Sequence, residues 1–135
     1  MAKYVDGFVI PLKKKNVKAY KKMADLGCKI WLKHGALDYY ECIGDDMNVP
    51  WGLGFKKMCK LKADETAVFA YIVFKSKAHR NAVNKKVMSD PLMDLGHTEM
   101  PFDGKRFAYA GFKTIVTGKK KTIKAKAKSK TKSKK

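Results

Sequence analysis

The most informative stretch of this sequence is TAVFAYIVF, which runs from Thr66 to Phe74. It is rich in β-branched and aromatic residues, which favour an extended strand. Successive side chains of a strand point to opposite faces, and here both sets are apolar. One face carries Thr66, Val68, Ala70, Ile72 and Phe74, and the other carries Ala67, Phe69, Tyr71 and Val73. A strand that is apolar on both faces is covered on both faces.

The segments around this strand predict one α+β domain. Apolar residues at three- and four-residue steps predict helices, and β-rich runs bounded by turn residues predict strands. The predicted elements are a strand at Tyr4–Ile10, a helix at Asn16–His34, a strand at Leu37–Gly44, a hairpin of strands at Phe55–Leu61 and Thr66–Phe74, a helix at Ser76–Met88, and a strand at Lys105–Val116. This order corresponds to a ferredoxin-like βαββαβ fold with an extra hairpin.

Turn and capping residues mark the ends of these elements. Asn16 and Ser76 are typical N-cap residues, and Gly35 suits the left-handed position that follows a helix. Pro11 is expected to end the first strand, because proline cannot donate a ladder hydrogen bond. Asp90-Pro91 predicts a further short helical turn, with the aspartate as cap.

The number of helices predicts a dimer. Two helices can cover only one face of a sheet of this size. The other apolar face therefore needs a partner, and the simplest partner is a second copy whose sheet packs face to face. The sequence thus predicts a homodimer.

The charge of the chain is concentrated at its C-terminal end. The 135 residues carry a formal net charge of +19. Residues 117–135 contribute ten of these charges without an acidic residue, and residues 1–116, the predicted domain, contribute the other nine. The ten lysines of this tail are Lys119, Lys120, Lys121, Lys124, Lys126, Lys128, Lys130, Lys132, Lys134 and Lys135.

The composition of residues 117–135 predicts a disordered tail, because it has almost no apolar surface to bury. Clustered lysines favour non-specific binding to nucleic acid or another polyanion. The tail has no aromatic residue and no arginine, so reading of a base sequence is not expected. The alternative is a tail that only increases solubility.

Several classes of protein are not expected. Cys28, Cys42 and Cys59 form no CxxC pair and do not combine with the histidines at metal-ligand spacing, so we expect no metal site and no cofactor. The sequence shows neither a signal peptide nor an apolar run long enough to span a bilayer. These features predict a cytoplasmic protein.

Two charged residues are candidates for catalysis. Asp6 shares its face of the first strand with apolar residues, where a carboxyl group can act as a general acid or base. The alternative is a carboxylate that is paired or solvated. Arg106 has a planar guanidinium group that can donate two parallel hydrogen bonds to an anionic ligand. Glu41 is expected to meet Arg106 across the sheet, either as a structural ion pair or as a substrate clamp.

Aromatic residues suggest a small-molecule pocket. Tyr39, Tyr71 and Tyr109 lie on predicted strands, and Trp31 lies on the first helix. Together with Glu41 they are expected to line a cleft between the sheet and the helices. The alternative is an ordinary aromatic core.

Four segments resemble the YbaA-like family of small bacterial proteins. They begin with YVDGFV at Tyr4, GAL at Gly35, SKAHRNA at Ser76 and MPFDGKR at Met100, and the second extends through ECIGDD at Glu41. The resemblance covers about residues 3 to 116 and implies a dimeric α/β barrel. It implies no single activity, because the superfamily includes cofactor-independent monooxygenases, isomerases and haem-handling proteins. The lysine tail departs from the family pattern.

These observations favour an accessory or ligand-binding homodimer that holds an unknown small molecule and contacts a polyanion through its tail. A small cofactor-independent enzyme of the monooxygenase or isomerase type is the alternative. A nucleic-acid-associated structural protein, in which the domain serves to pair two tails, is a third hypothesis.

Overall fold

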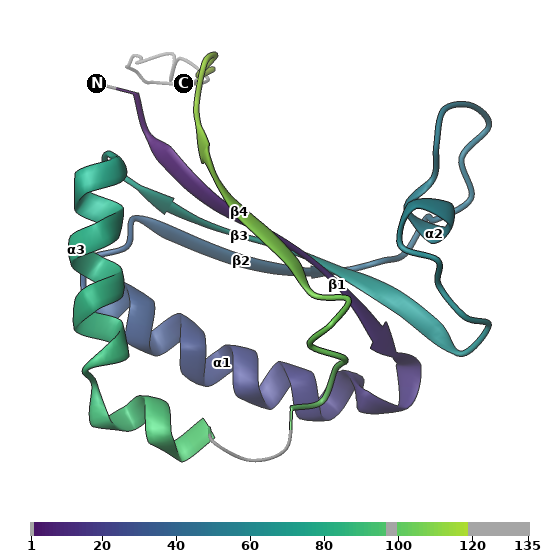
Figure 1. Cartoon of the computed structure of the whole chain (residues 1–135), viewed down its shortest axis with the longest axis horizontal. Helices are drawn as coiled ribbons and strands as arrows, with labels where there is room; N and C mark the ends of the chain where they lie inside the picture. The colour runs from purple at the N-terminus through teal and green to yellow at the C-terminus, as the bar shows by residue number, and fades with distance from the viewer. Residues whose placement is uncertain (1, 97–99, 119–135) are drawn as a thin grey trace, which may run out of the picture.

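The computed structural model describes residues 2–96 and 100–118 (Figure 1). Its elements in chain order are β1 (Tyr4–Lys13), the 3₁₀ helix η1 (Lys14–Asn16), α1 (Val17–Lys33), β2 (Asp38–Ile43), α2 (Phe55–Met58), β3 (Glu65–Phe74), α3 (Lys77–Met88), the 3₁₀ helix η2 (Pro91–Gly96) and β4 (Ala108–Lys113). The strands form one antiparallel sheet in the order β2-β3-β1-β4. The predicted α+β class and ferredoxin-like plan are confirmed.

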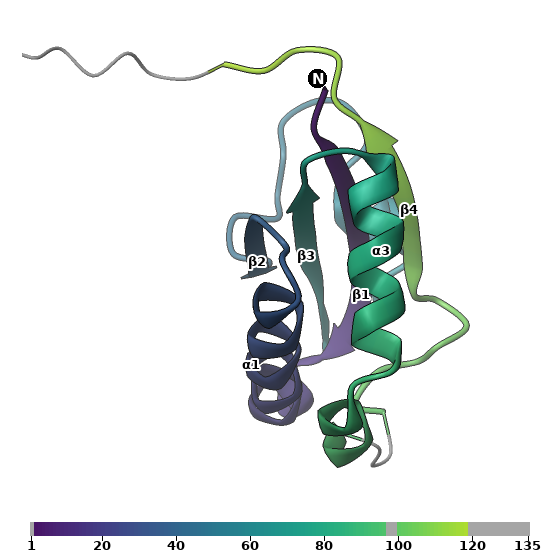
Figure 2. The same cartoon turned by 90° about the vertical axis from the view of Figure 1, so that its left-hand side faces the viewer.

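The helices α1 and α3 lie on the same side of the sheet (Figure 1). Figure 2 shows α1 near the β2 edge and α3 toward β1 and β4. The side chains of β3 that point to these helices are buried. Phe74 is completely buried, and Val68 and Ile72 are 2% and 4% exposed. Burial of this apolar face is the main force that holds helices and sheet together.

The predicted helix ends are largely confirmed. The Ser76 hydroxyl accepts a hydrogen bond from the backbone amide of His79 at 3.1 Å, as an N-cap does. Gly35 has φ = +112°, a conformation that favours glycine, directly after α1. Asn16 flanks α1, but its side-chain amide donates to the carbonyl of Pro101 at 3.0 Å instead of capping the helix.

Pro11 does not end the first strand. β1 continues to Lys13, and Pro11 lies opposite Ala67 of β3. The pairing of β1 with β4 stops at Val9, so β1 has a single neighbouring strand at Pro11. A residue without an N–H group is tolerated in such a one-sided part of a sheet.

The predicted hairpin strand at Phe55–Leu61 is wrong. This segment contains the short helix α2, in which the Cys59 amide donates to the Phe55 carbonyl at 2.8 Å. The reason lies in the sheet topology, because β3 pairs with β1 on one side and with β2 on the other. Both edges of β3 are therefore occupied, and no hairpin strand can pair with it. Residues 55–61 lie outside the sheet and contain α2.

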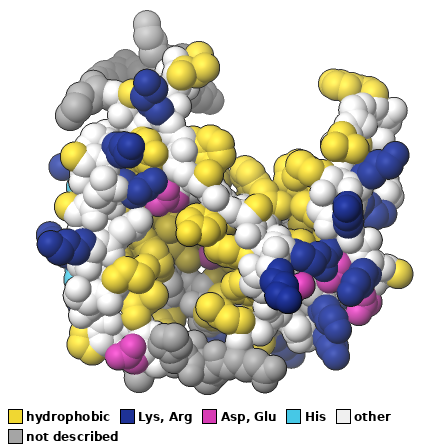
Figure 3. Space-filling view, in the orientation of Figure 1, with side chains coloured by type: hydrophobic (Ala, Val, Ile, Leu, Met, Phe, Trp, Pro, Cys, Tyr) yellow, Lys and Arg dark blue, Asp and Glu magenta, His cyan; other side chains and the backbone are white. Residues whose placement is uncertain are grey.

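The second face of the sheet is apolar and is largely uncovered by the described residues, except near α2, where Ala67 is buried and Phe55 contacts Phe69. Phe69 of β3, Tyr40 of β2 and Phe112 of β4 are 47%, 50% and 57% exposed. The rings of Tyr40 and Tyr71 stack on this face with centroids 5.1 Å apart. Figure 3 shows hydrophobic side chains along the hollow between the two raised ends of the molecule. We call this surface the open face.

The predicted tail of residues 117–135 lies, apart from its first two residues, outside the part of the chain that the structure describes.

Candidate ligand-binding cavity

A cavity of about 430 Å³ lies between the sheet and the helices. Its walls are almost entirely apolar, with side chains from β1, α1, β2 and β3 and from the segment before β4. The lining residues are Phe8, Ile10, Tyr20, Met23, Ala24, Leu26, Gly27, Ile30, Trp31, Tyr39, Tyr40, Glu41, Ala70, Ile72, Met93, Met100, Phe102 and Phe107. Tyr40 borders the cavity although its ring stacks on Tyr71 on the open face. Its volume is within the range of about 300–1,000 Å³ that is typical of small-molecule sites.

The polar part of the cavity is the Glu41 carboxylate with two tyrosines. Glu41 lies opposite the buried Ala70 in the register of β2 and β3, so its side chain points to the helix side. The Tyr20 hydroxyl of α1 donates to one carboxylate oxygen at 2.6 Å, and the Tyr39 hydroxyl donates to the other at 2.8 Å. Tyr39 reaches it because residues two apart share a face of a strand. The three side chains form a fixed cluster, which we call the Glu41 cluster.

Both tyrosines of this cluster keep their protons at neutral pH. Burial is the main cause that raises the pKa of Tyr20 and of Tyr39 well above the usual phenol value. The hydrogen bonds to Glu41 and its negative charge raise both pKa values further. The hydroxyl groups therefore act as donors to the carboxylate.

A second hollow of about 480 Å³ borders the same cluster. It lies between α1 and β2 and includes Cys28 and Cys42. Burial, followed by the charge of Asp25, raises the pKa of the Cys28 thiol, which makes that thiol a weaker nucleophile at neutral pH. The Glu41 cluster thus forms a wall that both hollows share.

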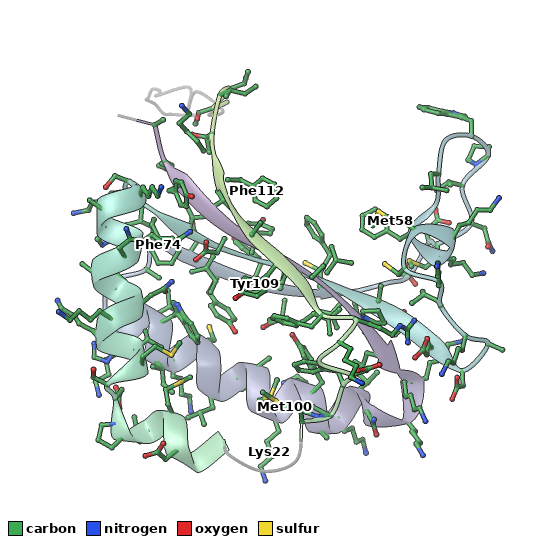
Figure 4. The ribbon with its side chains drawn as sticks, in the orientation of Figure 1. Lys22, Met58, Phe74, Met100, Tyr109 and Phe112 are labelled. Carbon is green, nitrogen blue, oxygen red and sulfur yellow. The ribbon has the colours of Figure 1, made fainter. Side chains whose placement is uncertain are left out.

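The segment before β4 closes one end of the cavity. Phe102 packs edge-on against Tyr20, with ring centroids 6.1 Å apart, and it stacks on Phe107 at 5.4 Å. Phe107 in turn lies 5.9 Å from Phe8 of β1. Figure 4 shows Met100 on this helix side of the sheet, while Phe112 points away on the open face.

The structure brings together some of the predicted aromatic residues. Trp31 and Tyr39 are neighbours, with centroids 6.3 Å apart, and both line the cavity with Glu41. Tyr71 does not join them, because it lies on the open face. Tyr109 lies on the edge strand, stacks on Phe8 at 6.0 Å and is 69% exposed. Of the three tyrosines predicted to share one cleft, only Tyr39 lines the cavity. Tyr71 lies on the other face of β3, and Tyr109 lies on the helix side of β4 but outside the lining.

Asp6 is buried in a polar network that lies outside the cavity lining. Its carboxylate accepts from the Arg80 guanidinium at 3.1 Å and from the Asn84 amide at 3.5 Å. The Asn84 carbonyl oxygen accepts from the Trp31 indole at 3.0 Å. The Arg80 guanidinium also lies over the Tyr4 ring, 4.9 Å from its centroid. This geometry is that of a paired carboxylate linking β1, α3 and α1, the alternative that the sequence left open.

Arg106 does not meet Glu41. It precedes β4 and binds Glu65 at the start of β3 through two hydrogen bonds, of 2.7 Å and 3.0 Å. It also donates to the carbonyls of Cys59 and Lys60. The predicted Glu41–Arg106 pair is wrong, because the strand order separates β2 from β4 by two other strands. The guanidinium ties the segment around α2 to the turn before β4.

Sequence reasoning missed several residues of the cavity. Tyr20 was not among the predicted pocket residues, and its hydroxyl donates to Glu41 of β2. Phe102 and Phe107 contribute through a fold-back of the segment that precedes β4. One local signal existed for the cluster, because Tyr39 and Glu41 alternate on one side of their strand.

Within residues 2–96 and 100–118, no group of three or more His, Cys, Asp and Glu side chains is placed to hold a metal ion. Among the same residues, no helix combines the length and the hydropathy needed to cross a membrane.

Comparison with known proteins settles the family. Residues 3–104 match the family described as a protein of unknown function, DUF1428. The chain belongs to this family. It is 40% identical over 114 residues to YbaA of Escherichia coli and of Shigella flexneri, which covers 84% of this chain and 97% of each relative. The YbaA-like resemblance of the sequence motifs is thereby confirmed.

A solved structure supports the fold. A dimeric ferredoxin-like protein from an uncultured marine organism superposes with a TM-score of 0.54 at 12% identity, over 87% of this chain and all of that chain. At this identity the likeness concerns the fold alone. The family and the fold leave the function to be argued from the site.

Proposed function

We propose that this member of the DUF1428 family is a homodimer that binds a small, largely apolar molecule in the cavity of each subunit. The observation that carries this proposal is the cavity of about 430 Å³ that contains the Glu41 cluster. A packed core leaves few voids larger than a water molecule. A hollow of this size, lined by apolar side chains around one fixed polar group, has the usual composition of a ligand site.

The open face supports the homodimer. Large apolar side chains from three strands, Tyr40, Phe69 and Phe112, are about half exposed on it. A contiguous apolar surface of this kind marks an interaction site. A second copy placed sheet to sheet covers both open faces at once, through a self-complementary two-fold contact. The ferredoxin-like protein of similar fold is itself described as dimeric.

A substitution that fills the cavity tests the ligand. Ala24 is buried in the cavity lining, whereas Ala19 is exposed on the same helix. Ala24→Leu removes ligand space, and Ala19→Leu is the matched control. A bound ligand stabilises the native state by mass action. Extensive dialysis should therefore lower the melting temperature of the wild type and of Ala19→Leu by about 5 °C, but not that of Ala24→Leu.

Circular dichroism before heating verifies that both variants are folded. Equal melting temperatures before and after dialysis in all three proteins would count against a ligand that is held in the cell.

We also propose that the tail binds polyanions without sequence preference. Its ten lysines provide the charge, and a dimer doubles the tails, which raises avidity by effective concentration. Duplex DNA binding should weaken steeply with salt, with a log–log slope of up to about −9 if all ten lysines engage phosphates. A chain that ends at Val116 should bind far more weakly at low salt. Equal binding by both chains contradicts this role.

An isomerase-like enzyme is the second candidate. Glu41 is a carboxylate with two phenol donors at the wall of an apolar cavity, an arrangement suited to moving a proton between two carbons of a bound molecule. The Asp6 carboxylate is already paired with Arg80, so Glu41 replaces it in this hypothesis. No observation among the described residues favours the monooxygenase alternative.

A further inference from the structure

We infer that the cavity selects an organic cation, an apolar molecule with a protonated amine, which the Glu41 carboxylate holds. This inference rests on the proposed ligand-binding function and names the chemical class of the ligand.

The charge of the lining is the first argument. Glu41 is the single acidic side chain among the described residues that line the cavity, and none of the others is basic. Glu41 is solvent-exposed on the outer strand β2, so its attraction for a charged ligand group depends on direct contact at the border of the cavity. An anionic ligand would meet this carboxylate without a compensating cation. A cationic ligand would complete an ion pair.

The hydrogen-bonding capacity of the site is the second argument. A carboxylate offers about four acceptor positions and no donor. The Tyr20 and Tyr39 hydroxyls each occupy one position with their only proton. The indole N–H of Trp31, which also lines the cavity, is bonded to Asn84. The polar groups of the cluster therefore present free acceptors and no free donor, so the complementary ligand group is a donor.

The protonation of the tyrosines supports this assignment. Burial and the neighbouring carboxylate raise the pKa of both phenols. Both hydroxyls therefore remain neutral, and the negative charge of the cluster is that of Glu41 alone.

The aromatic walls are the third argument. Phe8, Trp31, Phe102 and Phe107 line the cavity around the cluster. The faces of aromatic rings attract cations, and the effect is larger where water is excluded. Met23, Met93 and Met100 add flexible side chains that adapt to an irregular apolar body. The walls thus accept both the apolar body and the charged head of an amine.

The net charge of the chain does not oppose this preference at short range. The +19 is dominated by lysines, and charges farther away than about 8 Å are largely screened at physiological salt. The contact with Glu41 then determines whether a cationic, a neutral or an anionic ligand binds best in the cavity.

Three probes with one body and different heads test the inference. They are 4-phenylbutylamine, 4-phenylbutanol and 4-phenylbutyrate, and their binding to the full chain is measured by isothermal titration calorimetry at pH 7. We expect the amine to bind at least about tenfold more tightly than the alcohol, because a charge-assisted hydrogen bond is stronger than a neutral one. The carboxylate probe should bind most weakly.

Substitution of Glu41 identifies the source of the preference. Glu41→Gln removes the charge and keeps the volume, and it should reduce the amine-to-alcohol ratio to near one. Asp38→Asn, an exposed acid on the same strand, should leave the ratio unchanged. Tyr39→Phe keeps the charge of Glu41 and should keep the amine preference. This variant controls for effects that come from any substitution in the cavity lining and not from loss of the Glu41 charge.

The outcomes separate this inference from the proposed function. Equal binding of amine and alcohol, unchanged by Glu41→Gln, overturns the cation preference and leaves a ligand cavity in place. Tightest binding of the carboxylate probe overturns it as well. If none of the three probes binds while dialysis still lowers the melting temperature, the inference fails and the proposed function stands. If neither test responds, both fail.

Discussion

Both arginines of this protein form ion pairs that join separate elements of the fold. Arg80 joins Asp6, Asn84 and Tyr4 into a network between β1 and α3. Gly111 of β4 makes this approach possible, because a Cβ atom at that position would collide with the Arg80 guanidinium and the Tyr4 hydroxyl. The glycine at this position has a packing role that its sequence context alone does not reveal.

Arg106 and Glu65 form the other arginine pair. The hydrogen bond from Arg106 is the main cause that lowers the pKa of Glu65 to about 2, and the Lys62 backbone amide adds to it. A pKa that is lower in the folded state contributes stability above the unfolded value. This contribution is complete above a pH of about 4.5, the ordinary glutamate value, and is lost as the pH falls toward about 2.

We expect Glu65→Gln to lower the free energy of unfolding at pH 7 by about 1–3 kcal/mol, because the partly buried Arg106 loses its charged partner. The loss should disappear toward pH 2, where Glu65 becomes protonated in the wild type. Urea denaturation from pH 7 to pH 2 measures this, and Asp64→Asn, an exposed neighbour, is the control. A constant difference across the whole range would assign the stability to packing instead.

At the scale of elements, the sequence predicted what depends on local patterns. The stripe of α1, the Ser76 cap of α3 and the alternation of β3 are readable because the residues that carry each signal are close in sequence. The segment 55–61 was predicted as a strand joined to β3 through residues 62–65. The topology decides against it, since both sides of β3 are already paired.

The cavity could be predicted only in part for the same reason. Trp31, Tyr39 and Glu41 were identified from their residue types. Their partners Tyr20 and Phe102 depend on contacts between segments that are far apart in sequence, such as the bond from Asn16 to the Pro101 carbonyl. The assignment of Tyr71 failed because β3 is apolar on both faces, so its pattern does not show which face meets the helices.

At the scale of the whole molecule, the two faces of the sheet differ in what covers them. The helix side holds the cavity and the Glu41 cluster. The open face carries Phe69, which contacts Phe55 of α2 edge-on at 6.4 Å. Figure 4 shows Met58 of α2 and Phe112 of β4 on this same side of the sheet. In the proposed homodimer, a second copy on this face would leave the cavity of each subunit free, so ligand binding and dimerisation would use opposite faces of the sheet.

Native mass spectrometry of the gently purified protein tests the central claim most directly. We predict a dimer mass with a small adduct on each subunit for the wild type. Phe69→Asp places a charge on the open face and should give monomers. Leu32→Asp, at a position of similar exposure on α1 (44% against 47%), should remain a dimer that carries the adduct. A monomeric wild type, or a stable dimer of Phe69→Asp, would contradict the account.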